Sequence, residues 1–256
     1  MKTYSSYFDY EYDLGEHVVS NSLAEFNIDV DGKSVLDIGC GEGGVLAGLG
    51  ANYTFSALGV DYDQEMINRA KPLDNVTLKC ADFLEMDFDE SYDLLLLRDV
   101  LEHCGDVSQF LQKTASLMHE SSAVYITYTP FYSPFGGHQH NGSGIFSNVP
   151  YIQVLPAGAF NKLIAPKGNL YKEQKDLIKD FDEIRRTCLT TNSVLQQCRQ
   201  FGLHVSQSRA FIIRPDYKFK FGLSPLKLPA FVTPSSFTDP LCTSVEMILT
   251  KNKQAS

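Results

Sequence analysis

The sequence predicts an α/β fold built around a mostly parallel β-sheet with helices on both faces. Short apolar stretches of strand length alternate with amphipathic helical stretches through the first half of the chain, which is the pattern of βαβ units. Several of these apolar stretches end in small or acidic residues, which indicates strands that lead to a common ligand-binding edge. The uniformly apolar run at 94–97 favours a strand that is buried on both faces, as in a parallel sheet.

The strands are predicted from apolar runs that are bounded by polar or turn-forming residues. In chain order they are residues 34–38, 55–60, 76–80, 92–97, 122–128, 204–213 and 244–250. The first five alternate with helical stretches, so they are expected to form the parallel part of the sheet.

The helices are predicted from the spacing of apolar side chains. Met66 and Ile67 lie at helical spacing after Asp63, which is a suitable N-cap, and Asp106 is the expected N-cap of a second amphipathic stretch. The predicted helices cover residues 16–28, 64–71, 107–120, 171–184 and 193–202.

Two long connections interrupt the alternation of strands and helices. Residues 129–190 are rich in proline, glycine and aromatic side chains at their start, and we expect them to form an insertion that serves as a lid for the substrate. Residues 211–243 form a second long connection between the last two strands. The whole chain, residues 1–256, is expected to fold as a single domain.

Composition argues against several classes of partner. The formal net charge of -9 would repel a phosphate backbone, so we expect no nucleic-acid substrate. No run of residues approaches the roughly 18 apolar residues that span a bilayer, and the start of the chain does not resemble a signal peptide, so no membrane insertion is expected. Six cysteines without paired spacing favour reduced thiols and a cytoplasmic location.

The stretch VLDIGCGEGG, residues 35–44, points to a ligand site. Its glycines also match the pattern of dinucleotide-binding enzymes, so they leave an NAD(P)-dependent reductase open. Asp37 and Glu42 would each repel a phosphate about 6 Å away by roughly 3 kcal/mol at an effective dielectric near 20, unless they point away. S-adenosylmethionine has no phosphate and carries a sulfonium and an ammonium, so we expect it as the cofactor, with Asp37 facing the ammonium.

Further candidate cofactor residues follow the other strands. Asp61 lies at about the position in the chain where an acid that binds ribose hydroxyls is expected, although it is also a possible helix N-cap. The neighbouring Tyr62 is a candidate to cover the adenine. Asp82 and Phe83 follow the third strand, where an acid accepts from an adenine amino group and an aromatic ring stacks. Arg98 ends the fourth strand at the same edge.

With these residues in view, the chain resembles the class I S-adenosylmethionine-dependent methyltransferases, and within them the small-molecule type of quinone biosynthesis. VLDIGCGEGG, GVDYD, ADF and YDLLLLRDVLEH resemble four motifs of that family. The resemblance implies a Rossmann-like methyltransferase fold, with a mostly parallel seven-stranded sheet, a reversed last strand and an inserted lid after strand 5. It implies these cofactor-binding residues: Asp37, Gly39, Cys40, Gly41, Asp61, Tyr62, Asp82, Phe83 and Arg98.

The sequence also departs from two branches of that family. Members that methylate base amines have an Asn-Pro-Pro-Tyr type of signature after the fourth strand, where this chain has residues 98–101 with a different sequence. Catechol-type members place acids for a divalent ion, and we find no matching pair, so we expect no metal. A small-molecule acceptor is expected in place of nucleic acid.

Transfer of a methyl group to a hydroxyl needs alignment of the acceptor and a group that removes its proton. His138, in the glycine-rich stretch FGGHQH, is the first candidate for that base, and His103 after the fourth strand is the second. The alternative is that these histidines, and His140, only stabilise their loops. We expect an oxygen nucleophile and in-line displacement, with an NAD(P)-dependent reductase and a non-catalytic cofactor-binding module as the alternatives.

Arg214 is a candidate anchor for an acidic acceptor, or one of several charges in a solvated strand.

Overall fold

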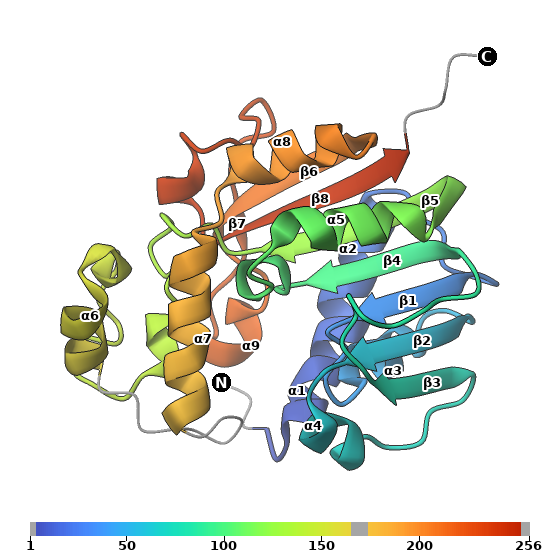
Figure 1. Ribbon diagram of the computed structural model, residues 1–256, viewed down its shortest axis with the longest axis horizontal. Coiled ribbons are helices and arrows are strands. Elements are labelled where there is room, and N and C mark those ends of the chain that lie inside the picture. Colours follow the sequence, from blue (N-terminus) through green and yellow to red (C-terminus); the bar gives the residue numbers. More distant parts are fainter. Residues whose placement is uncertain (1–3, 165–173, 252–256) are drawn as a thin grey trace.

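The computed structural model describes residues 4–164 and 174–251, which form a mixed β-sheet with helices on both faces (Figure 1). The strand order in the sheet is β3-β2-β1-β4-β5-β8-β6-β7. The strands are β1 (Ser34–Ile38), β2 (Ser56–Asp61), β3 (Val76–Cys80), β4 (Tyr92–Arg98), β5 (Met118–Tyr128), β6 (Leu203–Ile213), β7 (Leu226–Lys227) and β8 (Ser244–Lys251). The predicted fold class is confirmed, and the eighth strand is the two-residue β7 at the edge.

The first five strands in sequence are parallel, and β1 lies between β2 and β4. Asp37 in β1 is level with Gly59 in β2 and Leu96 in β4, so the carboxyl ends of the three strands lie at one edge of the sheet. The last strand, β8, is antiparallel to both β5 and β6, which is the expected reversal. Ligands of open α/β sheets bind at such a carboxyl edge.

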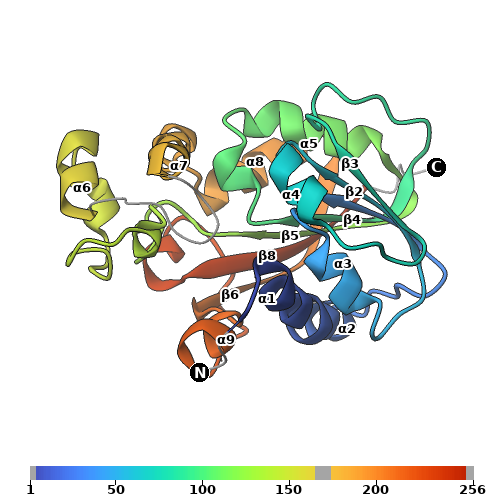
Figure 2. The same ribbon diagram turned by 90° about the horizontal axis from the view of Figure 1, so that it is seen from below.

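Helices cover both faces of the sheet (Figure 2). One face carries α1 (Tyr7–Asp13), α2 (Ser20–Glu25) and α3 (Gly44–Leu49), with the π-helical stretch Leu14–Val19 joining α1 to α2. The other face carries α5 (Val107–Ser116) and α8 (Thr191–Gln200). The helix α4 (Gln64–Arg69) follows β2.

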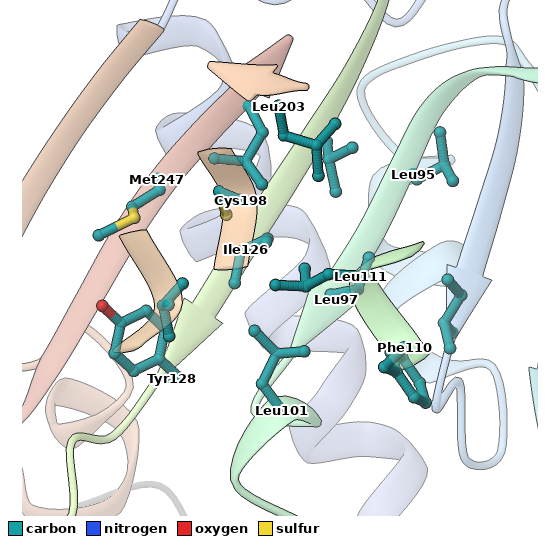
Figure 3. Packing of buried hydrophobic residues seen from close by; sticks show 14 of the residues in the cluster. Leu95, Leu97, Leu101, Phe110, Leu111, Ile126, Tyr128, Cys198, Leu203 and Met247 are labelled. Atoms are coloured by element: carbon teal, nitrogen blue, oxygen red, sulfur yellow. The ribbon is translucent and has the colours of Figure 1, made fainter. Parts of the chain in front are cut away.

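The larger apolar core lies between the sheet and α5 and α8 (Figure 3). Leu95 and Leu97 of β4 and Ile126 of β5 belong to the same buried cluster as Leu111 of α5 and Cys198 of α8. Removing such side chains from water is the main favourable contribution to folding. The apolar run at 94–97 was predicted to be buried on both faces of its strand, and all four of its residues are buried.

Glycines allow the N-terminal helices to lie directly against α3. A Cβ atom on Gly48 would lie 2.1 Å from the carbonyl oxygen of Tyr12, and one on Gly15 would lie 2.2 Å from that of Val45. A Cβ atom on Gly44, the last glycine of the VLDIGCGEGG stretch, would lie 2.5 Å from Cβ of Glu11. Gly44 therefore serves helix packing, which brings α1 close to the glycine loop.

Two helix starts agree with the sequence, and one helix end does not. Asp63 accepts from the backbone N–H groups of Glu65 and Met66, and Asp106 accepts from that of Gln109, so both are N-caps. The helix predicted for 107–120 ends earlier, because Met118 begins β5, where it is level with Tyr92 of β4. The apolar residue at the end of the helical stripe is therefore buried by the sheet.

The connection after β5 has a small apolar core of its own. It contains the short 3₁₀ turns Gln139–Asn141 and Ile152–Val154, followed by α6 (Ala157–Ile164) and α7 (Gln174–Thr187). The buried residues of this core are Ile152, Phe160, Ile164, Leu177 and Phe181. Both helices lie beyond the carboxyl edge of the parallel strands (Figures 1 and 2). Residues 1–3, 165–173 and 252–256 lie outside the described residues. The second of these ranges contains the start of the predicted helix at 171–184 and part of the expected lid, and the other two are the ends of the predicted domain.

The second long connection contains α9 (Tyr217–Phe221), β7 and the 3₁₀ turn Asp239–Leu241. Within 4–164 and 174–251, no helix combines the length and the apolar character needed to cross a membrane.

Candidate active site

The glycine loop after β1 is held by bonds within the protein. Gly39, Gly41 and Gly43 all have positive φ angles, which glycine adopts without steric cost. The backbone N–H groups of Gly39 and Cys40 donate to the carbonyl of Val60. The N–H of Gly43 donates to the carbonyl of Cys40. These amides already have partners, so the loop differs from the open amide cradles that bind phosphate.

Asp61 connects the glycine loop to the end of β2. Its Oδ2 accepts from the backbone N–H of Gly41 at 2.8 Å, and its Oδ1 accepts from that of Asp63 at 2.9 Å. Asp63 caps α4, so Asp61 does not need to act as the N-cap. Asp61 therefore ties the glycine loop to the turn that precedes α4.

Asp37 lies buried in a group of charged side chains at the end of β1. Burial raises its pKa to about 7; Arg98 opposes this rise, and Glu11 and Asp61 add to it. Nη1 of Arg98 lies 3.8 Å from Oε1 of Glu11, which comes from α1. The Arg98 side chain thus faces the same region as Asp37. A cationic ligand here would stabilise the ionised form of Asp37.

Glu42 was expected, with Asp37, to repel a phosphate ligand, but its side chain does not face the site. Its side chain is buried, and its Oε1 accepts from Nε of Arg69 in α4 at 2.8 Å. Because this ion pair compensates the charge of Glu42, the negative character of the loop comes from Asp37 and Asp61 instead. The sequence argument allowed for acids that point away, and Glu42 is such an acid.

The remaining candidate cofactor residues differ in their surroundings. Tyr62 is 72% exposed beside the site, so its ring is open to a ligand. Oδ1 of Asp82 accepts from the backbone N–H of Leu84, which stabilises the turn after β3. Phe83 is buried in the core, with its ring centroid 4.7 Å from that of Phe110. This interior position does not support stacking of Phe83 on an adenine ring.

The structure brings the two candidate catalytic histidines together. The ring centroids of His103 and His138 lie 5.2 Å apart, although His138 comes from the inserted segment and His103 follows β4. Nε2 of His138 lies 3.8 Å from Oε1 of Glu102, and Nδ1 of His103 lies 2.9 Å from Oδ1 of Asp180. Two histidines and two carboxylates thus meet near the carboxyl edge of β4.

Two buried glutamines position the loop that bears His138. Nε2 of Gln139 donates to the carbonyl of Pro134, and Nε2 of Gln153 donates to the carbonyls of Phe131 and Ser133. Gly137 comes directly before His138, and a Cβ atom on it would lie 2.3 Å from Cβ of Gln153. Gly136 is equally restricted, since its Cβ would lie 2.2 Å from the carbonyl oxygen of Phe131.

His138 itself has a positive φ of 51°, a conformation that is rare for residues other than glycine. Such backbone strain persists only where the surroundings impose it, and it is common at functional sites. The tight packing of Gly136 and Gly137 and the glutamine bonds impose it here.

Burial sets the charge states in this cluster. Burial raises the pKa of Glu102 to about 7, and the charge of Asp99 adds to the rise. Burial, together with His103 and His140, holds the pKa of His138 well below its ordinary value. Burial also lowers the pKa of His140 to about 3, with help from Lys220 and Arg214. Both imidazoles are therefore neutral near pH 7, and a neutral imidazole can accept a proton or bind a metal ion.

Arg214 is engaged inside the protein. It pairs with Asp99 and with Asp216, and its Nη1 donates to Oγ1 of Thr129 at 3.0 Å. Burial alone would raise the pKa of Asp99, but Arg214 and Arg98 outweigh it and hold that pKa below its ordinary value. The sequence offered Arg214 as an anchor for an acidic acceptor, whereas its ion pairs tie the second long connection to the end of β4.

Glu102, Asp180 and Glu11 belong to the site but were not among the catalytic or cofactor-binding candidates from the sequence. Asp180 lies on the buried face of α7 with Leu177, Phe181 and Ile184. An acid within an apolar helical stripe is a recognisable signal, because burial of an unpaired carboxylate is costly. Glu11 gave no such signal, since only the packing of α1 on α3 brings it to Arg98.

A hollow of about 290 Å³ lies at the opposite end of the sheet. It is lined by residues of α3 and by the segments that lead into β2 and β3, among them Phe55 and Val76. Because these residues are at the amino ends of the strands, the hollow takes no part in the site described above.

Comparison with known proteins identifies the family. Residues 11–173, more than half of the chain, match the methyltransferase domain family. A (S)-tetrahydroprotoberberine N-methyltransferase from Eschscholzia californica is 31% identical over 104 residues, which are 38% of this chain and 29% of that protein. A ubiquinone biosynthesis O-methyltransferase from Bradyrhizobium diazoefficiens is 33% identical over 104 residues, 38% of this chain and 40% of that one. The matched part thus spans less than half the length of these curated relatives.

A solved structure extends the likeness in fold over nearly the whole chain. The plantazolicin methyltransferase BpumL, in complex with a monoazolic desmethylPZN analog and SAH, has a TM-score of 0.58 at 15% identity, and the match covers 96% of this chain and 86% of that one. The predicted resemblance to class I methyltransferases is therefore confirmed at the level of family and fold. The chain belongs to the methyltransferase domain family.

Proposed function

We propose that this protein transfers the methyl group of S-adenosylmethionine to a hydroxyl oxygen of a small, ring-bearing molecule. The aromatic side chains of residues 131–151 favour an acceptor that carries a ring. The observation that carries the proposal is the pair formed by the half-buried His138 and the buried Glu102, 3.8 Å apart, near the edge of the sheet where the glycine loop lies.

The glycine-loop region suits the sulfonium cofactor. Asp37 and Asp61 provide negative charge at the ends of β1 and β2, and the amides of Gly39 and Cys40 already have backbone partners. Asp37 would face the ammonium group and Asp61 the ribose hydroxyls, with Tyr62 over the adenine. The SAH-bound plantazolicin methyltransferase, which has the same fold, supports this choice of cofactor. The pyrophosphate of a dinucleotide would find the amides of Gly39, Cys40 and Gly43 already engaged and the carboxyl groups of Asp37 and Asp61 nearby.

The histidine and carboxylate pair favours an oxygen acceptor. A neutral amine attacks a methyl group without help, whereas a hydroxyl must lose its proton as the O–CH₃ bond forms. In the proposed reaction, the acceptor O–H bond breaks and its proton passes to Nε2 of His138. The oxygen forms the new bond while the S–CH₃ bond breaks, and the sulfonium leaves as a neutral thioether. Burial keeps His138 neutral before the reaction, and the carboxylate of Glu102, 3.8 Å from Nε2, would stabilise the imidazolium that forms when His138 accepts the proton.

The inserted segment is proposed as the lid over the acceptor. Residues 129–190 provide both His138 and Asp180, and their described part has its own apolar core. Such a segment excludes water from the reaction and completes the site from outside the sheet. We propose that the chain is one domain and that residues 211–243 support the lid through Arg214. The six free cysteines agree with the cytoplasmic location that we propose.

The test is turnover with a panel of hydroxyl and amine acceptors. Purified protein is incubated with S-adenosylmethionine, and methylated product and S-adenosylhomocysteine are quantified by mass spectrometry. The proposal expects products from ring-bearing hydroxyl compounds. His138→Ala should lower kcat by about 10²- to 10⁴-fold while cofactor affinity stays the same. The matched control is His204→Ala, an exposed histidine on β6 that should leave kcat unchanged.

Three outcomes would contradict the proposal. Methylation of amines alone would replace the oxygen acceptor. Oxidation of NADH or NADPH without use of S-adenosylmethionine would favour a reductase, and absence of turnover over the whole panel would favour a non-catalytic cofactor-binding module.

A further inference from the structure

Three potential metal ligands converge at the proposed active site. Among the described residues, Glu102, His103 and His138 each offer one nitrogen or oxygen atom, and these atoms all lie within 4.8 Å of one another. Two histidines and one carboxylate form a common ligand set for divalent transition-metal ions, with positions left open for a further ligand.

Glu102 provides an independent sign that a ligand is expected here. Its side chain is buried, and Oε1 accepts from the backbone N–H of Thr129 at 3.1 Å. Oε2 is buried as well, and within the described part of the chain it has no hydrogen-bond partner. A buried carboxylate oxygen without a partner is costly, and a cation next to it would remove this cost.

His103 has the outer contact that is typical of a metal-binding histidine. Its Nδ1 faces Oδ1 of Asp180 at 2.9 Å. A carboxylate on one ring nitrogen orients the ring and increases the basicity of the other nitrogen, which is the one that binds the metal. Asp180 comes from α7, so this contact also links the site to the inserted segment.

The dimensions of the cluster suit a small ion. Ligand atoms lie about 2.1 Å from a bound zinc ion, so two of them are at most about 4.2 Å apart. His138 and Glu102 already meet this limit at 3.8 Å. The widest pair in the cluster needs to approach by less than about 1 Å, a shift that small side-chain rotations provide.

We propose that Glu102, His103 and His138 bind one divalent transition-metal ion, of the class of Zn²⁺, Co²⁺ or Mn²⁺, and that an open position of this ion takes the acceptor oxygen. This inference rests on the proposed function and changes one role within it. A cation lowers the pKa of a hydroxyl that it binds, so the acceptor proton leaves to water and His138 is a ligand while the ion is present. The bond changes at oxygen, carbon and sulfur are the same as in the proposed function.

A second group of side chains serves as an internal control. Asp13, Glu16 and His17 also lie within reach of one another among the described residues. Here Asp13 already accepts from the hydroxyl of Tyr4, and His17 is exposed on the surface and stacked near Phe219. Unlike Glu102, none of these three residues has a buried side-chain atom without a partner in the described part of the chain.

The experiment measures binding of Co²⁺ to the full chain after removal of metal by a chelator. Metal content after gel filtration and calorimetry should show one Co²⁺ per chain, with Ca²⁺ and Mg²⁺ binding more weakly because two ligands are nitrogens. Glu102→Gln, which keeps the shape of the side chain, and His138→Ala should each weaken Co²⁺ binding by at least about 100-fold. His17→Ala should bind Co²⁺ as the unmodified protein does. Binding of S-adenosylhomocysteine by each variant shows that it is folded.

The outcomes separate this inference from the proposed function. Equal Co²⁺ binding by the His138→Ala and Glu102→Gln variants, or loss of binding in the His17→Ala variant, overturns the site. Hydroxyl methylation by metal-free protein that still depends on His138 also overturns it, and leaves the proposed function intact. One Co²⁺ bound through Glu102 and His138, without methylation of any hydroxyl, supports the metal site and contradicts the proposed function.

Discussion

Nδ1 of His103 lies 2.9 Å from Oδ1 of Asp180, and this contact joins the segment after β4 to helix α7 of the insertion. The two residues are far apart in sequence; Asp180 is buried and His103 is half-buried. The contact therefore couples the position of the lid to the orientation of a histidine at the reacting end of the site.

Asp180→Asn tests that coupling. Asparagine keeps the size of the side chain but removes the charge that orients the imidazole, so we expect turnover and Co²⁺ affinity to fall by about 10- to 100-fold. Steady-state kinetics and calorimetry measure both. Asp176→Asn, on the exposed side of the same helix, is the control and should have little effect. Equal effects of the two variants would contradict a positioning role for Asp180.

The affinity for S-adenosylmethionine should depend on pH through Asp37. Its pKa of about 7 in the free protein means that half of the molecules carry a protonated carboxyl group at that pH. The ammonium group binds the ionised form, so affinity should rise as pH increases and should be about tenfold higher at pH 8 than at pH 6.

Asp37→Asn should remove this pH dependence and weaken binding at pH 8 by about 10- to 100-fold, the usual loss when a charged hydrogen-bond partner is removed. Asp89→Asn, at an exposed position, serves as the control. Calorimetric titrations at several pH values measure the effect. An unchanged pH dependence in Asp37→Asn would show that another group is responsible.

The sequence predicted the central sheet because its strands carry local signals. The apolar run in β4 and the N-caps Asp63 and Asp106 are each visible in a few neighbouring residues, and the structure has all three. The boundary between α5 and β5 was wrong, because Met118 fits an apolar helical stripe and a buried strand equally well. Only the sheet contact with Tyr92 decides between them.

The candidate site was predictable only in part. Asp37 lies near the carboxyl end of β1 and Asp61 is the last residue of β2, so their place at the edge of the sheet followed from the fold. The contacts of Asp180 and Glu11 depend on how an insertion and an N-terminal helix pack, which no local pattern specifies. The pairing of Glu42 with Arg69 could not be predicted for the same reason, because Arg69 lies on α4, outside the glycine loop.

Gly48→Ala tests the close packing of the N-terminal helices on α3. The added methyl group would lie 2.1 Å from the carbonyl oxygen of Tyr12, so we expect a loss of about 1–3 kcal/mol in the free energy of unfolding. Gly158→Ala in α6 is the matched control, since a Cβ atom there meets nothing within 4 Å, and it should be neutral or stabilising by up to about 1 kcal/mol. Urea denaturation measures both variants. A Gly48→Ala variant as stable as the control would contradict the packing described here.

Gln153→Ala tests how the loop that bears His138 is held. The change leaves the carbonyls of Phe131 and Ser133 without their side-chain donor, at a cost of about 1–3 kcal/mol for each group that stays buried. We expect faster hydrogen exchange in residues 131–141 and reduced turnover, with unchanged affinity for S-adenosylmethionine. Gln196→Ala, at an exposed position of α8, is the control. Unchanged exchange in that loop would show that other contacts hold it.

The central claim is that the carboxyl groups of Asp37 and Asp61, at the ends of β1 and β2, select a cationic, phosphate-free cofactor. Isothermal titration calorimetry of the purified chain with S-adenosylmethionine, S-adenosylhomocysteine, NADH and NADPH tests it most directly. The account predicts saturable one-to-one binding of the first two ligands and no measurable binding of either dinucleotide. Saturation by NADH or NADPH, together with no heat from either sulfur compound, would contradict it.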